Sequence, residues 1–311
     1  MLFRSTPPDP ATLGDGGLAE DARLVGPSDV AVDGAGNVYI ADACSFRLRV
    51  INTGGYITTL AGTGAQGVEV DTTHSTAVNI PFTSVGPIAS CLMGVVHLVE
   101  GGVLRQVEFY PWGAPQDATS EILATGLTAP PTAGGPSLGP VTDLACGRED
   151  YLVYSAGGHV FEVSMATGQR TLLVGTGGSI LTCGASCPAT EPGTQSYLES
   201  LPRRHLNLQA LQAGLGQVVG VARTETGHLY VSVKDTWTHG AQPTEVHHVL
   251  HITPDGFVEL EGGNGLAFDG DDQHVAEQSP LTVGTVTLDR RGNLLVSGLG
   301  HRVRRLNVAP V

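Results

Sequence analysis

Residues Gly14 to Gly64 contain four short β-type runs in succession, and this unit restricts the possible fold more than any other feature of the sequence. The runs are Asp29–Asp33, Val38–Ala41, Arg47–Ile51 and Tyr56–Ala61, and glycine-rich turns separate them at Gly34–Asn37 and Thr53–Gly55. This pattern predicts a small four-stranded antiparallel sheet. A single sheet of this size leaves a face unburied, so the unit requires neighbouring copies of its own kind.

Four further copies of the unit follow along the chain. The position of Pro27 recurs at Pro87, Pro140, Gln217 and Val283. In each copy the first two runs are almost continuously apolar, as in VAVD and VYIAD. The third runs alternate apolar with polar residues, as in RLRVI at 47–51 and VLRQV at 103–107. We therefore expect the first two strands of each sheet to be buried and the third to be half-buried on the outside.

Five sheets in radial array predict an all-β fold, a β-propeller of four-stranded antiparallel blades over a single domain, residues 1–311. Five blades are favoured, and six are the alternative. The last copy lacks a recognisable fourth strand. Met1–Arg4 precedes Asp15 by nearly the same distance as Phe257–Glu261 precedes the aligned Asp272. We expect the N-terminal strand to complete the last blade, which would remove two exposed sheet edges.

Several segments resemble NHL repeats. They are GDGGLAEDARL, GPSDVAVDGAGNVYIAD, FRLRVI and ITTLAGTG in the first copy, and GGNGLAFDGDDQHVAEQSPL with VTLDRRGNLLVSGLGHRVRRL in the last. The middle copies are degraded but stay in register. The resemblance implies a β-propeller, most often six-bladed in that family. Related propellers include calcium-dependent enzymes and amidating lyases with a histidine-bound zinc, but no motif here matches those ligands.

Charge limits the class of partner. The chain has 311 residues, 41% of them hydrophobic, with 16 basic against 30 acidic side chains and a net charge of −14. Such an excess of negative charge disfavours nucleic acid or an anionic membrane surface as the main partner. No run reaches the roughly 20 apolar residues that span a bilayer, and Met1–Pro10 has no apolar core of a signal peptide. We expect a monomer that binds a protein, peptide, glycan or small molecule.

Five cysteines give a partial indication of the compartment. Cys183 and Cys187 lie close enough for a small disulfide, while Cys91 and Cys146 fall near the ends of comparable inner strands, and Cys44 is left over. This spacing and the turn-rich composition favour an extracellular or periplasmic location, with reduced thiols in the cytoplasm as the alternative.

Three connections are longer than in the opening unit and mark where function is to be sought. These insertions cover residues 64–86, 175–217 and 235–247. The first two insertions connect the fourth strand of one blade to the first strand of the next, and the third connects a second strand to a third. Connections of these two types emerge on the same propeller face, which we therefore expect to be the working surface.

Acidic and histidine residues are the candidates for a metal site. Asp269, Asp271 and Asp272, with Asp15 in the aligned loop, are candidate calcium ligands, since calcium accepts clustered carboxylates. The competing interpretation makes Asp15 and Asp272 turn-forming residues. Asp42 and Glu100 end aligned second strands and are expected at a channel mouth, where Asp42 is a further candidate metal ligand. Zinc is the weaker alternative, pooled from histidines of the loop-rich face: His74, His205, His239, His247 and His274.

Other patterned polar residues have a structural explanation. Asp33 and Asp289, with the pairs Gly36–Asn37 and Gly292–Asn293, belong to hairpin turns, because Asp, Gly and Asn tolerate positive φ. No Gly-x-Ser-x-Gly motif supports nucleophilic catalysis. The leading hypothesis is a binding or scaffold propeller that uses its loop-rich face and central channel. The alternative is a metal-dependent hydrolase, lactonase or lyase with its site at the channel mouth.

Overall fold

The computed structural model describes residues 10–67, 75–109, 117–131, 137–148, 150–178, 209–239, 242–265, 281–289, 291–298 and 302–306. These residues divide into two compact units. Unit 1 comprises residues 1–128 with 165–168, and unit 2 comprises 129–164 with 169–311.

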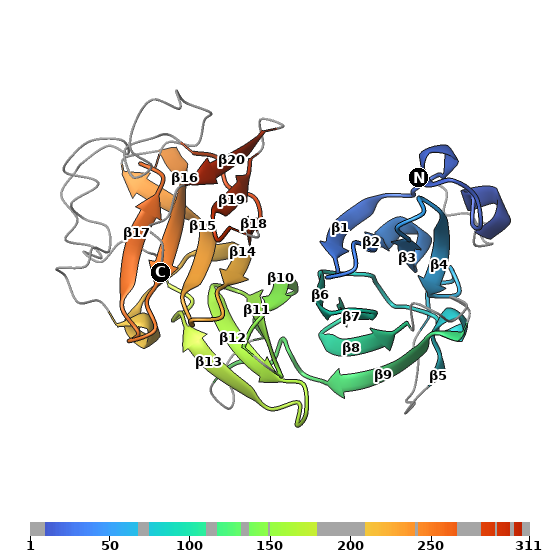
Figure 1. Ribbon diagram of the computed structural model, residues 1–311. Helices are drawn as coiled ribbons and strands as arrows, with labels where there is room; N and C mark the ends of the chain where they lie inside the picture. Colours follow the sequence, from blue (N-terminus) through green and yellow to red (C-terminus); the bar gives the residue numbers. More distant parts are fainter. Residues whose placement is uncertain are drawn as a thin grey trace. The chain divides into compact units, whose positions relative to one another are not determined.

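Unit 1 contains two antiparallel sheets, blades 1 and 2 (Figure 1). Blade 1 consists of β1 (Pro27–Val32), β2 (Val38–Asp42), β3 (Arg47–Ile51) and β4 (Ile57–Ala61). Blade 2 consists of β6 (Ile88–Leu92), β7 (Val95–Glu100), β8 (Val103–Glu108) and β9 (Thr119–Ala124), with the short β5 (Ser75–Thr76) added beside β9. One hydrophobic core lies between the two blades and includes Tyr39, Leu48, Phe82 and Leu98.

Unit 2 contains three sheets, blades 3 to 5. Blade 3 consists of β10 (Val141–Cys146), β11 (Tyr151–Ala156), β12 (His159–Ser164) and β13 (Arg170–Val174). Blade 4 consists of β14 (Gln217–Arg223), β15 (Leu229–His239), β16 (Gln242–Ile252) and β17 (Val258–Gly262). In the described residues blade 5 has three strands, β18 (Val286–Leu288), β19 (Leu294–Ser297) and β20 (Val303–Leu306). Apolar side chains fill the space between blades 3 and 4 and between blades 4 and 5.

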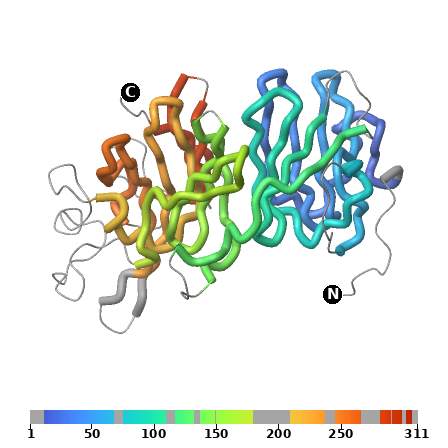
Figure 2. The backbone as a smooth tube through the Cα atoms, turned by 90° about the horizontal axis from the view of Figure 1, so that it is seen from below, coloured from blue at the N-terminus to red at the C-terminus, as the bar shows by residue number. Residues whose placement is uncertain are grey.

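Short 3-10 turns precede the first strand and connect several later ones. They are η1 (Pro10–Leu13), η2 (Ala19–Asp21), η3 (Ala43–Ser45), η4 (Ala77–Asn79) and η8 (Ala210–Gln212). The backbone trace in Figure 2 follows the up-and-down path of the chain within the sheets. Among the described residues, no helix is long and apolar enough to cross a membrane.

Hairpin turns of the repeated sequence template set the register of the inner strands. Asp33 accepts hydrogen bonds from the backbone N–H groups of Ala35 and Asn37, both at 2.9 Å, and from the Asn37 amide at 2.9 Å. Gly36 has a φ of 94°, in the left-handed region that favours glycine. Asp289 makes the same bonds to Arg291 and Asn293. These aspartates are therefore structural, as their sequence context predicts.

The inner strands of adjacent blades are joined by an aspartate at one equivalent position. In unit 1, Asp29 of β1 accepts the N–H of Ile88 in β6 at 2.8 Å. In unit 2, Asp143 of β10 accepts the N–H of Val221 in β14, also at 2.8 Å. An inner strand has one edge without a strand partner, so a carboxylate that reaches the next blade satisfies a main-chain donor that the sheet leaves open.

The predicted fold class is confirmed, because the described strands form five antiparallel blades, a five-bladed β-propeller. One expectation within it is wrong. The third strands are not uniformly half-buried, since β3 buries Arg47 and Arg49 and β8 buries Arg105. The N-terminal strand that is expected to complete the last blade falls on residues outside those described, and the single-domain assignment stays a prediction.

Candidate functional site

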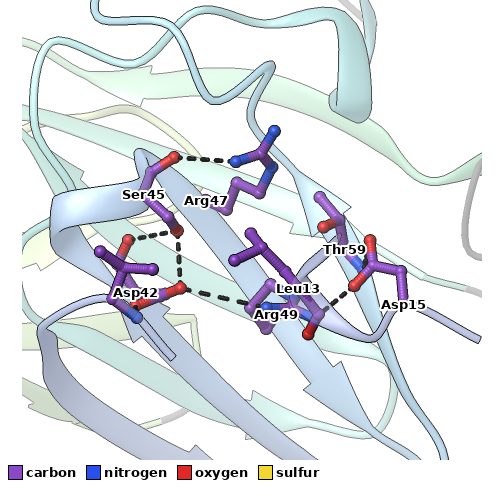
Figure 3. Close-up of polar contacts among 8 residues, drawn as sticks. Leu13, Asp15, Asp42, Ser45, Arg47, Arg49 and Thr59 are labelled. Carbon is purple, nitrogen blue, oxygen red and sulfur yellow. Dashed lines mark hydrogen bonds and ion pairs between the residues drawn. The ribbon is translucent and has the colours of Figure 1, made fainter. Parts of the chain in front are cut away.

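The polar contacts of blade 1 centre on Arg49, whose side chain on β3 is fully buried. Its Nη2 donates to Oδ1 of Asp15 and, at 3.4 Å, to the carbonyl oxygen of Leu13. Oδ2 of Asp42 lies 4.0 Å from its Nη1 (Figure 3). Two of the predicted metal ligands, Asp15 and Asp42, therefore face the same guanidinium, which supplies the positive charge that a bound cation would provide.

Both carboxylates also accept hydrogen bonds from other donors. Asp15 accepts the backbone N–H of Thr59 at 3.1 Å. Asp42 accepts the backbone N–H of Val25 at 2.6 Å and the hydroxyl of Ser45 at 2.7 Å. These contacts tie the segment before β1 and the turn after β2 to the blade. A metal ion at either aspartate would have to displace these donors.

The other predicted ligands are not brought together within the described residues. Asp269, Asp271, Asp272 and His274 lie outside them, and His239 ends β15 with a side chain that is not described. Within the part of the chain that the structure describes, no group of three or more His, Cys, Asp or Glu side chains is arranged to hold a metal ion. The calcium site and the weaker zinc alternative stay predictions.

Blade 2 repeats the arrangement of blade 1 with Glu100 and Arg105. Oε2 of Glu100 lies 3.3 Å from both Nε and Nη2 of Arg105. Oε1 accepts the backbone N–H of Thr83 at 2.6 Å and its hydroxyl at 3.1 Å. The expectation that Asp42 and Glu100 open onto a channel mouth is wrong, because they are 0% and 5% exposed and turn inward to the arginine of the next strand.

The buried arginines are the site residues that sequence reasoning missed. In an alternating strand, polar positions predict a solvent-facing side, and the alternation in RLRVI and VLRQV predicts exposed arginines. The signal that identifies them is the acidic residue at the end of the preceding strand, since Asp42 and Glu100 sit close to these arginines across the hairpin. Gly64 also makes room for Arg47: a Cβ there would lie 2.2 Å from Nη2 of that arginine.

Burial favours the neutral form of two histidines of blade 4, His247 and His248. Nδ1 of the buried His247 accepts the backbone N–H of Val283 at 3.0 Å, so Nε2 carries the proton and donates to Glu245 at 2.6 Å. Burial lowers the pKa of His247, and Glu245 partly offsets that shift. Both ring nitrogens are thus engaged. Burial also lowers the pKa of the neighbouring His248 to about 4. Of the predicted histidine pool, His74 and His205 lie outside the described residues.

The insertion at 235–247 is largely paired β-structure rather than an irregular loop. Strands β15 and β16, each of 11 residues, pair continuously from Leu229↔Ile252 to His239↔Gln242. Strand β14 accompanies them only as far as Lys234, so five residue pairs extend beyond it, from Asp235↔Val246 outward. We call the paired residues 235–239 and 242–246 the ribbon. In blades 2 and 3 the same connection is a two-glycine turn, Gly101–Gly102 and Gly157–Gly158.

Three cysteines are described. Cys91 and Cys146 are disulfide-bonded, while Cys44 is a free and exposed thiol within η3. Disulfides persist mainly in oxidising compartments.

Comparisons with known proteins agree with this architecture. Residues 3–85 match the family model described as the Teneurin NHL domain. Teneurin-1 of Caenorhabditis elegans is 46% identical over 52 residues, which is 17% of this chain and only 2% of that protein.

Two solved structures are similar to this chain at low sequence identity. A protein of unknown function from Bacteroides thetaiotaomicron VPI-5482 is 13% identical, with a TM-score of 0.51 over 94% of this chain and 72% of that one. A structure of a nidogen/laminin complex is 11% identical, with a TM-score of 0.49 over 90% of this chain and 76% of that one. Residues 3–85 are therefore similar to the Teneurin NHL domain, and the described strands form five antiparallel blades, a five-bladed β-propeller.

Proposed function

We propose that this protein is a binding module, located outside the cytoplasm, that holds a protein or peptide partner on the ribbon of blade 4. The observation that carries this proposal is the extension of β15 and β16 by five residue pairs past β14. Two-glycine turns suffice to connect the same strands in blades 2 and 3, so the propeller fold does not require the ribbon.

The backbone of the ribbon offers a ready means of recognition. On one side β14 pairs no further than Lys234, and on the other β17 pairs no further than Val249. Along the rest of the ribbon, no strand of the described chain pairs with either outer edge. An open strand edge can accept an extended peptide through main-chain hydrogen bonds, with side chains adding specificity.

The negative charge of the chain restricts the class of partner further. The chain has a net charge of −14, and Glu245 on the ribbon is 57% exposed. A neutral or basic extended segment is therefore the favoured partner. The oxidised Cys91 and Cys146 support the proposed location outside the cytoplasm.

A ribbon deletion tests the proposal. Replacing Trp237–Thr244 with two glycines keeps the Thr236↔Glu245 pair and every described side-chain contact at the base of the ribbon. The full chain and this variant are compared for binding to an array of extended peptides and extracellular domains, with melting temperature as the check on folding. We expect the folded variant to lose ligands that the full chain binds.

Equal binding by both proteins would contradict the proposal. Hydrolysis of a lactone that requires calcium and is unchanged by the deletion would instead favour the metal-dependent enzyme alternative.

A further inference from the structure

The two outer edges of the ribbon present different main-chain groups. In an antiparallel sheet, the N–H and C=O of successive residues point alternately to the neighbour on one side and to the neighbour on the other. In the turn that joins β14 to β15, the Thr224 N–H donates to the His228 carbonyl at 2.9 Å, so His228 faces β14. The pairing of β15 with β16 is regular out to His239, so every second residue after His228 faces the same way. Beyond the end of β14, Thr236 and Thr238 therefore turn their main-chain groups outward.

The outer edge of β16 is less able to pair with another strand. In the turn after β16, the Thr253 N–H donates to the Phe257 carbonyl at 2.9 Å. The same alternation then turns the main-chain groups of Glu245 and Pro243 outward. Proline has no N–H, and prolines and charged side chains on edge strands oppose pairing. An extended partner is therefore better accommodated at β15.

Asp235 lies where the open edge of β15 begins, because β14 pairs no further than Lys234. Its Oδ1 accepts the N–H of the next residue, Thr236, at 2.8 Å, and its side chain is half-buried. A Cβ on Gly216 would lie 2.9 Å from the Cβ and Cγ of Asp235. The glycine therefore lets the aspartate lie against the backbone just before β14.

Two inner-strand aspartates make the same contact, and each also holds a strand beside its own edge. Asp29 and Asp143 accept the N–H of the following residue through Oδ1, at 2.8 Å and 2.9 Å. Through Oδ2 they accept an N–H of the next inner strand, from Ile88 and Val221, at 2.8 Å. Oδ2 of Asp143 also accepts the Thr285 hydroxyl at 2.9 Å, so an oxygen in this position takes two donors.

We propose that Asp235 and the β15 edge hold an extended segment of a partner protein as Asp29 and Asp143 hold the inner strands. This inference rests on the proposed binding function of the ribbon. Oδ2 of Asp235 accepts an N–H of the segment, the Thr238 N–H donates to it, and the carbonyls of Thr236 and Thr238 accept from it. The residue opposite Asp235 has to carry an N–H, which excludes proline, and the carboxylate favours basic side chains nearby.

Binding of a designed strand tests the inference. The probe is a nonapeptide of alternating valine and lysine with acetylated and amidated ends, and calorimetry measures its binding to the full chain and to the ribbon deletion. We expect the full chain to bind it and the deletion to lose binding. Asp235→Asn keeps an acceptor for the Thr236 N–H but loses the carboxylate, and should weaken binding about tenfold. Thr238→Pro removes the outward N–H and should weaken binding at least about tenfold.

Amide hydrogen exchange locates the contact. In the complex, the Thr238 amide should exchange at least about tenfold more slowly than in the free protein, while the Glu245 amide keeps its rate. Glu225→Gln provides the charge control, because it removes one negative charge from an exposed residue of the turn between β14 and β15. This variant should bind the probe like the wild type. Melting curves establish that each variant folds.

The outcomes separate this inference from the proposed function. Suppose that the ribbon deletion loses the probe but Asp235→Asn binds it like the wild type, or that protection appears at Glu245 instead of Thr238. The inference would then be overturned, and the ribbon would remain the binding element. Absence of binding to the wild type would also overturn the inference alone. Equal binding by the wild type and the ribbon deletion would contradict the proposed function itself.

Discussion

Blades 1 and 2 of unit 1 and blades 3 and 4 of unit 2 fill the same two buried positions with opposite chemistry. One position ends the second strand, and the other is the third residue of the core part of the third strand. Unit 1 places Asp42 with Arg49 and Glu100 with Arg105 there, whereas unit 2 places Ala156 with Phe161 and Val233 with Leu250. All eight side chains are buried. The fold accepts either a charged pair or an apolar pair at this point.

The charged pairs and the apolar pairs also differ in their hydrogen bonds to the main chain. In unit 1 the carboxylates also accept main-chain N–H groups of Val25 and Thr83, in the segments that lead to the inner strands. Apolar side chains make no such bond, and in blade 4 the chain continues past Val233 into the ribbon. Unit 1 closes this end of its blades with polar contacts, while blade 4 uses the same end to extend a hairpin. This contrast places the proposed binding element in unit 2.

Replacing the charged pair of blade 2 with apolar residues should change the free energy of unfolding the most. Arg105→Leu leaves Glu100 buried without its cation and should lower the free energy of unfolding by about 3–5 kcal/mol. Adding Glu100→Val recreates the apolar pair of blade 4 and should recover at least half of that loss. Recovery stays incomplete because the Thr83 N–H loses its acceptor, at a cost of about 1–3 kcal/mol. Urea unfolding measures all three proteins.

An exposed arginine of unit 2 provides the control for this exchange. Arg148 pairs with Glu162 at 3.3 Å, but its side chain is 55% exposed. Arg148→Leu should therefore cost no more than about 1 kcal/mol. If the single and double blade 2 variants were equally unstable, Arg105 would act through packing rather than charge, and the contrast between the units would fail.

A buried histidine in each unit predicts a shared acid sensitivity. Burial lowers the pKa of His97 in β7 and of His248 in β16 to about 4. The folded pKa lies below the unfolded value of about 6.5, so stability is complete above pH 6.5 and falls as the unfolded chain takes up protons between pH 6.5 and 4. Each histidine should account for a loss of about 2–3 kcal/mol by pH 4.

Urea unfolding between pH 7 and pH 4 checks this prediction in His97→Gln and His248→Gln. Each variant should lose less stability on acidification than the wild type, and the difference isolates one histidine because all other titrating groups are common to both proteins. Parallel curves for a variant and the wild type would show that the histidine is not kept neutral by the fold.

The repeat template made the fold predictable, whereas the polar interior of the blades was not. Asp33 with Gly36–Asn37 specifies a turn through local backbone geometry, and the recurrence of that pattern at Asp289 reveals the repeat. Nothing local distinguishes a carboxylate that meets a metal ion from one that meets a guanidinium. Asp15 and Asp42 were therefore predicted as ligands, although Arg49, far from Asp15 in sequence, occupies the space between them. The ribbon was visible as an insertion, but its pairing depends on register across the hairpin.

Substitution of the aspartates that link inner strands should give the smallest difference in free energy of unfolding between the units. Asp29 and Asp143 each accept one N–H from the next blade, and Asp143 also accepts the Thr285 hydroxyl at 2.9 Å. Burial raises the pKa of Asp29, and the hydrogen bonds from the N–H groups of Ile88 and Val30 only partly offset that shift. The folded state therefore stabilises the ionised form of Asp29 less. Asp143→Ala should cost about 2 kcal/mol and Asp29→Ala about 1 kcal/mol.

Thr285→Val isolates the additional bond of unit 2. Alone it should cost about 1 kcal/mol, and in the Asp143→Ala background it should cost close to nothing, because its acceptor is already gone. Urea unfolding of the four proteins closes the cycle. An undiminished effect of Thr285→Val in the Asp143→Ala background would mean that the hydroxyl contributes independently of Asp143, and the two linking aspartates would then be energetically equivalent. A coupling near 1 kcal/mol would instead show that Asp143 joins blade 5 to the contact between blades 3 and 4, a role that the Asp29 contact with blade 2 does not include.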